Sequence, residues 1–184
     1  MSAPAAGGAN AGAGGAGAGA DGGALAGPQF EFAFAVRLRF TRVQNIPMLP
    51  AGFGRGAVYV DSGEIEGPLL RGKAVPASGG DYAQFRPDGV ISFDARYMLQ
   101  AEDGTLILLR NAGFLWGRRP DTMQRLRDMA FAGGPAVEPA EYYLRCTPTF
   151  EVAPGPYDWL MRHVFVGLGE RREDGNLVRY YKVL

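Results

Sequence analysis

The chain has 184 residues, in which 19 Lys and Arg residues are balanced by 19 Asp and Glu residues. Because nucleic acids and anionic membranes bind proteins with an excess of basic residues, the zero net charge speaks against both and favours a small molecule or another protein as partner. One cysteine and one histidine exclude an internal disulfide and the common Cys/His zinc frameworks, so neither a metal nor another cofactor is expected.

Residues 1–28 consist almost entirely of glycine and alanine. Glycine loses the most backbone entropy on ordering, and this segment has too few large apolar groups to compensate. The sequence therefore predicts a disordered tail at 1–28 and one folded domain at 29–184. It shows neither an export signal nor a run near the ~20 apolar residues of a membrane-spanning helix, so we expect a cytoplasmic protein with no membrane partner.

Period-two alternation marks the first predicted strands. Large apolar residues alternate with small or charged ones over residues 30–40, which is typical of a strand with one buried face. Two short runs follow, at residues 56–60 and 65–75. Between them lies Asp61-Ser62-Gly63, a composition typical of a turn, so the two runs are predicted to pair as a hairpin.

A second hairpin is the strongest local signal in the chain. It joins residues 81–86 to residues 90–99 through a turn at Pro87-Asp88-Gly89. The later predicted strands lie at residues 105–111, 141–150, 162–169 and 177–184.

One segment, at about residues 120–131, has a helical pattern. Pro120 lies in its first turn, apolar residues follow at three-to-four spacing, and Gly133-Gly134 follow its end. Short strands with closely spaced turns argue against a parallel α/β fold. They favour an all-β fold, a closed antiparallel β-barrel of about 8–9 strands and lipocalin-like shape, because closure leaves few strand edges exposed and a small barrel can hold one ligand.

The predicted strand at residues 90–99 has two different faces. Ile91, Phe93 and Tyr97 belong to a core face, whereas Asp94 and Arg96 share the other face about 7 Å apart. The two charged side chains either contact a polar ligand inside the barrel or belong to its wet outer surface. Periodicity alone slightly favours the outer surface.

A later predicted strand places Tyr143 and Arg145 together on one face. If both strands turn these faces inward, the barrel holds a cluster of Asp94, Arg96, Tyr143 and Arg145 that can bind a carboxylate, carbonyl or phenolate. Asp94 or Asp81 would then be a general base and Tyr143 a general acid. The alternative is an ion-pair network that serves only the structure.

Histidine and cysteine each occur once in the chain. A lone strand histidine is more often a hydrogen-bonded bystander than a catalyst, so His163 is retained only as a candidate ligand contact. Cys146 has no companion that would make it a thiolate nucleophile and is predicted to lie in the core.

Four motifs occur in a specific order. They are GPLLRGKAVPASGGDYAQFRPDG at residues 67–89, ISFDARYMLQAEDGTLI at residues 91–107, EYYLR from Glu141 and YDWLMR from Tyr157. In this order they resemble the bacterial and fungal family known as domain of unknown function 3237, over about residues 30–184.

The resemblance implies a small antiparallel β-barrel, often an oligomer, with a polar-lined cavity. It favours an inward orientation of Asp94 and Arg96. Tyr82 stands where the family usually has tryptophan and Met161 where it has asparagine, which implies a different or more apolar ligand. The characteristic polar positions of the family fall on Arg71, Asp81, Arg86, Asp94, Arg96, Tyr143, Arg145 and Trp159.

Two functions are compatible with these observations. The first is a cofactor-independent lyase, isomerase or cyclase that acts by acid/base chemistry in the barrel cavity on an aromatic or polyketide-like carbonyl compound. The second is a non-catalytic small-molecule-binding barrel. A homodimer through an exposed strand or the Gly52 loop is also compatible with the sequence. For the first function, the candidate catalytic residues are Asp94, Asp81 and Tyr143, and the candidate substrate contacts are Arg71, Arg86, Arg96, Arg145, Trp159 and His163.

Overall fold

A computed structural model describes residues 27–184, so the predicted disorder of the tail falls almost wholly outside the described residues. This part of the chain forms nine strands, the helix α1 and two short 3-10 helices, η1 and η2. In chain order these elements are β1 (Phe30–Ile46), β2 (Gly54–Glu66), β3 (Gly72–Ala74), β4 (Gly80–Phe85), β5 (Ile91–Ala101), β6 (Leu106–Gly117), α1 (Thr122–Phe131), η1 (Pro139–Glu141), β7 (Tyr142–Val152), η2 (Asp158–Met161), β8 (Phe165–Arg172) and β9 (Gly175–Val183).

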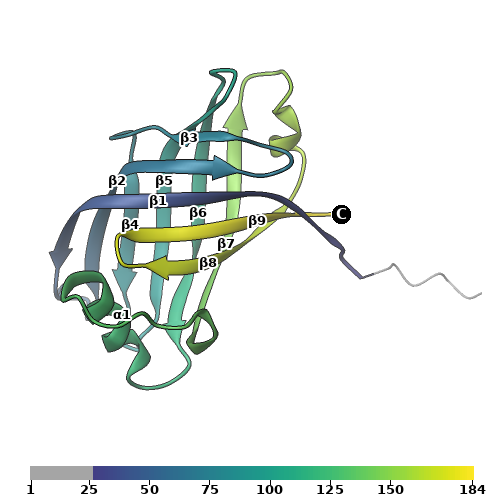
Figure 1. Ribbon diagram of the computed structural model, residues 1–184. Helices are drawn as coiled ribbons and strands as arrows, with labels where there is room; N and C mark the ends of the chain where they lie inside the picture. Colours follow the sequence, from purple (N-terminus) through teal and green to yellow (C-terminus); the bar gives the residue numbers. More distant parts are fainter. Residues whose placement is uncertain (1–26) are drawn as a thin grey trace, which may run out of the picture.

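The strands close into an antiparallel β-barrel, as predicted. Eight of them form a ring in the order β1-β9-β8-β7-β6-β5-β4-β2, and the pairing of β2 with β1 closes it. The short strand β3 pairs with β2 and β5 at one end of this ring. Helix α1 lies at the lower end of the barrel in Figure 1. The fold class and the single short helix predicted near residues 120–131 are therefore confirmed.

Strand β2 differs from the sequence prediction. The segment Asp61-Ser62-Gly63 was expected to form a hairpin turn, but β2 continues through it without interruption. The partner strand explains why, since Arg39 pairs with Ser62 and Phe40 pairs with Val60, which leaves Asp61 as an extra residue in a β-bulge. Residues with turn-like composition are thus accommodated inside a long, bent strand, and the predicted hairpin at 56–75 is wrong.

The inner side chains form two apolar clusters. The larger one includes Phe34, Leu99 and Phe150 and fills the part of the barrel remote from α1. In the smaller one, Leu126 and Met129 of α1 pack with inward residues of β6 and β7. Among the described residues, no helix is long and apolar enough to cross a bilayer.

Candidate functional site

A cavity of about 480 Å³ lies inside the barrel, lined by residues of both apolar clusters. Side chains of α1, among them Met123, Leu126 and Phe131, line one end of it. The walls are mostly apolar, which is typical of a site for a small organic ligand. Polar or titratable side chains in its lining are Asn45, Asp81, Tyr97, Asn111, Arg127, Cys146, Arg171 and Asn176.

Strand register brings Asp81 and Asn111 to the same level of the cavity. Asp81 on β4 pairs with Ala95 on β5, and Ala95 pairs with Asn111 on β6. Neighbouring strands are about 4.8 Å apart, so the two polar residues lie roughly 10 Å apart at the backbone, with only the small Ala95 between them. Both side chains line the cavity and approach the same space.

Asp81 provides the one carboxyl of the cavity lining formed by residues 27–184. Burial raises its pKa to about 6, against opposing contributions from Arg171 and from the Asp94 backbone amide. Its Oδ1 atom is fully enclosed and accepts no hydrogen bond from another described residue. A carboxyl with a pKa of about 6 exchanges a proton readily near neutral pH, which suits a general base.

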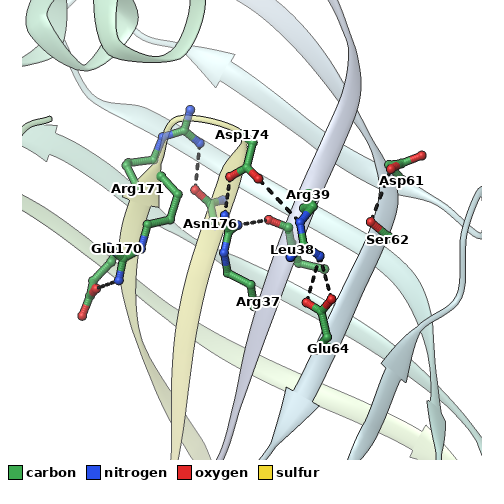
Figure 2. Close-up of polar contacts among 11 residues, drawn as sticks. Arg37, Leu38, Arg39, Asp61, Ser62, Glu64, Glu170, Arg171, Asp174 and Asn176 are labelled. Carbon is green, nitrogen blue, oxygen red and sulfur yellow. Dashed lines mark hydrogen bonds and ion pairs between the residues drawn. The ribbon is translucent and has the colours of Figure 1, made fainter. Parts of the chain in front are cut away.

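Arg171 faces Asp81 from the inner side of β8. Alternation along this strand turns Phe165, Gly167 and Gly169 inward, and Arg171 continues the series. Its Nη1 atom donates a hydrogen bond of 2.9 Å to Oδ1 of Asn176 on β9 (Figure 2). Burial lowers the pKa of Arg171, and the Asp81 carboxylate acts in the opposite direction. The pair provides a carboxylate and a guanidinium across one apolar space.

The neighbouring hairpin end is held by ion pairs outside the cavity. Asp174, in the turn between β8 and β9, pairs with Arg37 and with Arg39 of β1, as Figure 2 shows. Arg39 also bonds Glu64 of β2 at 2.7 Å. These contacts join the turn between β8 and β9 to β1, and β1 to β2, close to Arg171 in the chain.

Further buried polar groups lie near Asp81. The Tyr97 and Tyr180 hydroxyls are enclosed and interact electrostatically with each other, although they are not in hydrogen-bond geometry. Burial raises the pKa of both phenols. It also raises the pKa of the Cys146 thiol to about 12, which favours the neutral thiol, and this residue is buried in the core, as expected.

Of the predicted catalytic residues, Asp81 alone lines the cavity, and Asp94 is on the outer surface. The Asp94 carboxylate accepts two hydrogen bonds of 3.0 Å from Arg110 on β6 and lies 3.4 Å from Arg96. The inward residues of β5 are Ala95, Tyr97 and Leu99, which belong to the face identified as core from the sequence. The expected inward orientation of Asp94 and Arg96 is therefore wrong.

Tyr143 and Arg145 are also on the outer face. Tyr143 stacks on Trp116 with ring centroids 5.4 Å apart, and the Arg145 guanidinium lies over the Tyr143 ring. The inward residues of β7 are Tyr142, Leu144 and Cys146. The interior cluster of two arginines, a tyrosine and Asp94 predicted from the sequence does not form, because both strands turn their polar faces to solvent.

The remaining predicted ligand contacts lie elsewhere. Arg86 pairs with Asp88 in the turn between β4 and β5, and Arg71 lines a separate polar groove beside β3. Trp159 and His163 lie in and after η2, at the barrel end opposite α1 (Figure 1), where the His163 Nδ1 atom is 2.8 Å from the Trp159 carbonyl oxygen. None of these four lines the cavity among residues 27–184.

Sequence reasoning missed Arg171, Asn111 and Tyr97 as cavity residues. The alternation of residues along β8 could have indicated that Arg171 points inward. Arg171 was missed because it belongs to the charged run Glu170–Asp174, which has the composition of an exposed turn. Within the described residues, no three His, Cys, Asp or Glu side chains are arranged to hold a metal ion.

Comparison with known sequences gives one family. Residues 28–183 match the family described as "Protein of unknown function (DUF3237)". A UPF0311 protein of Clostridium acetobutylicum is 34% identical over 129 residues, which cover 70% of this chain and 77% of that protein. A UPF0311 protein of Rhodopseudomonas palustris strain TIE-1 is 29% identical over 154 residues, covering 84% and 95%.

Solved structures share the barrel. A conserved protein of unknown function from Rhodopseudomonas palustris has a TM-score of 0.77 and 25% identity, covering 86% of this chain and 99% of that one. A β-barrel-like protein from Acinetobacter baumannii has a TM-score of 0.71 and 27% identity, covering 86% and 98%. An enzyme from Penicillium herquei has a TM-score of 0.63 and 20% identity over 89% and 99%, a likeness of fold alone.

Proposed function

The chain belongs to the DUF3237 family, as its sequence motifs indicated, and on this premise we propose that it is a cofactor-independent enzyme that transfers a proton on a substrate bound in the barrel cavity. The substrate would be a small aromatic or polyketide-like carbonyl compound, and the reaction a lyase, isomerase or cyclase step. The observation that carries the proposal is the Asp81 carboxyl, which lies in an apolar cavity with a pKa raised to about 6 and faces Arg171.

In this mechanism Asp81 acts first as a base. The ionised carboxylate accepts a proton from a carbon or hydroxyl group next to the substrate carbonyl, and the resulting enolate or phenolate oxygen is stabilised by the Arg171 guanidinium. Neutral Asp81 then returns the proton to another atom of the same substrate. Asp81 keeps the role proposed from the sequence, and Arg171 takes the one that had been assigned to Arg96 and Arg145.

Two further observations bear on this proposal. The related fold from Penicillium herquei is described as an enzyme, which at 20% identity supports only that such a barrel can carry catalysis. The second candidate, a non-catalytic small-molecule-binding barrel, is favoured by the absence of another carboxylate from the lining formed by the described residues. Proton return by Asp81 itself removes the need for a second acid.

The test separates turnover from binding. Compounds of the proposed class that raise the unfolding temperature are incubated in D₂O, and ¹H NMR follows rearrangement or deuterium incorporation. Asp81→Asn should lower kcat by about 10²-fold or more with retained binding, because only the proton acceptor is lost. For the wild type, kcat/KM should rise as the pH passes about 6, where Asp81 loses its proton.

The matched control is Asp94→Asn, the same substitution on the outer surface, which should leave turnover and its pH profile unchanged. Unchanged turnover in Asp81→Asn would contradict the proposal. Bound compounds that show no deuterium incorporation and no rearrangement would favour the binding barrel.

A further inference from the structure

Four enclosed side-chain oxygens lie inside the barrel, and three of them belong to residues that line the cavity, Tyr180 being the exception. They have no hydrogen-bond partner among residues 27–184, and three of the four residues are almost completely buried: Tyr97 is 1% exposed, Asn111 5% and Tyr180 0%. Polar groups buried in this way in native proteins are nearly always satisfied, so the oxygens of the three lining residues are expected to receive their hydrogen bonds from what enters the cavity. The four atoms are Asp81 Oδ1, Tyr97 OH, Asn111 Oδ1 and Tyr180 OH.

The oxygens of Asp81, Tyr97 and Asn111 mark the floor of the cavity. Tyr97 and Asn111 line it, whereas the next inward residues of their strands, Leu99 and Leu109, are fully buried and do not. The opposite end is lined by α1, including Arg127. A ligand therefore has a polar floor at one end and the helix at the other.

The floor accepts hydrogen bonds more than it donates them. An ionised Asp81 carboxylate is an acceptor only, and the Asn111 amide group is directed at the Cys146 thiol, which leaves its Oδ1 atom for the cavity. The Tyr97 hydroxyl can accept or donate. A carboxylate or phosphate would meet the Asp81 charge here, whereas a hydroxyl group offers the missing donor.

We propose that this floor is a subsite for hydroxyl groups. The ligand is then a polyhydroxylated aromatic compound or an enol, and its hydroxyl-bearing end enters first. Asn111 sets the preference of the subsite for this compound over methylated analogues. The inference rests on the proposed function only in taking the same cavity as the substrate site. It holds equally for a catalyst or a binder.

Arg171 fixes the direction of such a ligand. It is the last inward residue of β8, beyond Gly169, whose backbone packs against Leu144 of the cluster that contains α1. With hydroxyl groups on Asp81 and Asn111, the carbonyl oxygen of the ligand lies towards the guanidinium. Asp81 then contacts both the hydroxyl end and the carbon atoms beside the carbonyl, as the proposed proton transfer requires.

The test compares 1,3-dihydroxynaphthalene with 1,3-dimethoxynaphthalene, which share the ring system and differ in hydrogen-bond donors. Calorimetric titration of the full chain at about pH 8 should show about tenfold tighter binding of the dihydroxy compound. Asn111→Leu should reduce that preference to about threefold or less by weakening the dihydroxy compound alone. The control Gln84→Leu, on the outer face of β4, should keep it.

The outcomes separate this inference from the proposed function. If the wild type binds both compounds within about threefold, the hydroxyl subsite is overturned while the cavity stands as an aromatic site. If neither compound binds at about 1 mM, the substrate site of the proposed function falls as well. If the preference holds but no substrate turns over, the subsite is supported and the catalysis is not.

Thermal unfolding without ligand provides a second readout. Replacing an unpartnered buried polar group by an apolar one is nearly neutral or stabilising, so Asn111→Leu and Tyr97→Phe should unfold at the wild-type temperature or above it. Unfolding temperatures lowered by several degrees in both variants, with an unchanged ligand preference, would show that the floor serves only the structure. If Asn111→Leu does not fold, Tyr97→Phe, which keeps the ring, decides between these results.

Discussion

Asp81 and Asp94 lie on neighbouring strands, and their surroundings move their pKa values in opposite directions. Burial raises the pKa of Asp81, which points into the barrel. Hydrogen bonds from Arg110 lower the pKa of Asp94, which points away from it. The two residues are chemically identical, so the side of the sheet that each occupies decides which one can exchange a proton near neutral pH.

The first prediction concerns the stability of Asp81→Asn. The pKa of Asp81 in the folded state, about 6, lies above its ordinary value of 3.8, so stability contributed by the neutral carboxyl is complete below about pH 4 and is lost as the pH rises through 6. Asparagine escapes this loss. Asp81→Asn should exceed the wild type in free energy of unfolding by up to about 3 kcal/mol at pH 8 and by nothing near pH 4, as urea titrations can measure.

Asp94→Asn provides the control of opposite sign. Because its folded-state pKa is lowered, the stability that Asp94 contributes is present above its ordinary pKa and is lost as the pH falls through the lowered one. The substitution should therefore weaken the protein slightly at pH 8. A stability difference between Asp81→Asn and the wild type that does not change with pH would contradict the buried, titrating carboxyl.

Strand alternation was sufficient to divide the residues of β5 between two faces, and the face with Ile91, Phe93 and Tyr97 was correctly identified as the inner one. The resemblance to the polar motif positions of the family favoured an inward orientation of Asp94 and Arg96, and this prediction is wrong. A pattern of polar residues cannot distinguish a catalytic cluster from the outer ion pair that Asp94 makes with Arg110 on another strand. That contact depends on the register between β5 and β6, which composition does not determine.

At the scale of elements, α1 closes one end of the cavity through packing and one ion pair. Leu126 and Met129 of the helix are buried, and no side chain caps its N-terminus by a hydrogen bond. Arg125 donates hydrogen bonds of 2.6 and 3.1 Å to the Glu141 carboxylate, which joins the helix to η1. The helix thus depends on tertiary contacts more than on its own signals.

The second prediction is that Glu141→Gln loosens this helix. Loss of the charge-assisted pair should favour local opening, and amide hydrogen exchange in residues 122–131 should become roughly threefold faster while the barrel strands keep their protection. Exchange mass spectrometry measures this segment directly. Asp158→Asn breaks a 2.7 Å ion pair with Arg162 at the other end and should leave exchange in α1 unchanged.

The sequence was sufficient to predict α1 but not the continuity of β2. The helix was predicted from Pro120 and the paired glycines after it, signals that lie within the helix and its flanks. The continuity of β2 was not, because the bulge at Asp61 exists only in relation to β1. Local composition describes what a segment tolerates, and the partner strand determines which of the tolerated conformations forms.

At the scale of the whole molecule, charged pairs surround the outer surface of the barrel and a few polar groups remain inside it. The pairs of Asp94 with Arg110 and of Glu64 with Arg39 each link neighbouring strands. The equal numbers of basic and acidic residues are thus partly matched by local pairs on the barrel surface. Three of the five buried side-chain oxygens that have no hydrogen-bond partner among residues 27–184 belong to residues that line the cavity.

The last prediction concerns the boundary of this folded unit. The family match begins at residue 28, β1 begins at Phe30, and the Leu184 amide donates a hydrogen bond of 2.9 Å to the Gln29 carbonyl, which joins the residue before β1 to the residue after β9. The glycine and alanine composition before Gly27 predicts no stabilising contact. Deleting residues 1–26 should leave the unfolding temperature within about 2 °C of that of the full chain.

The control is a longer deletion, of residues 1–33, which removes the first residues of β1 and their pairing with β9. Because Ala33 is fully buried and the Phe32 ring packs on Tyr181, this deletion should lower the unfolding temperature by many degrees or prevent folding. Calorimetry on the three chains distinguishes the possibilities. If deleting residues 1–26 alone lowers the unfolding temperature by more than about 5 °C, the segment contacts the barrel and the folded unit extends beyond residues 29–184.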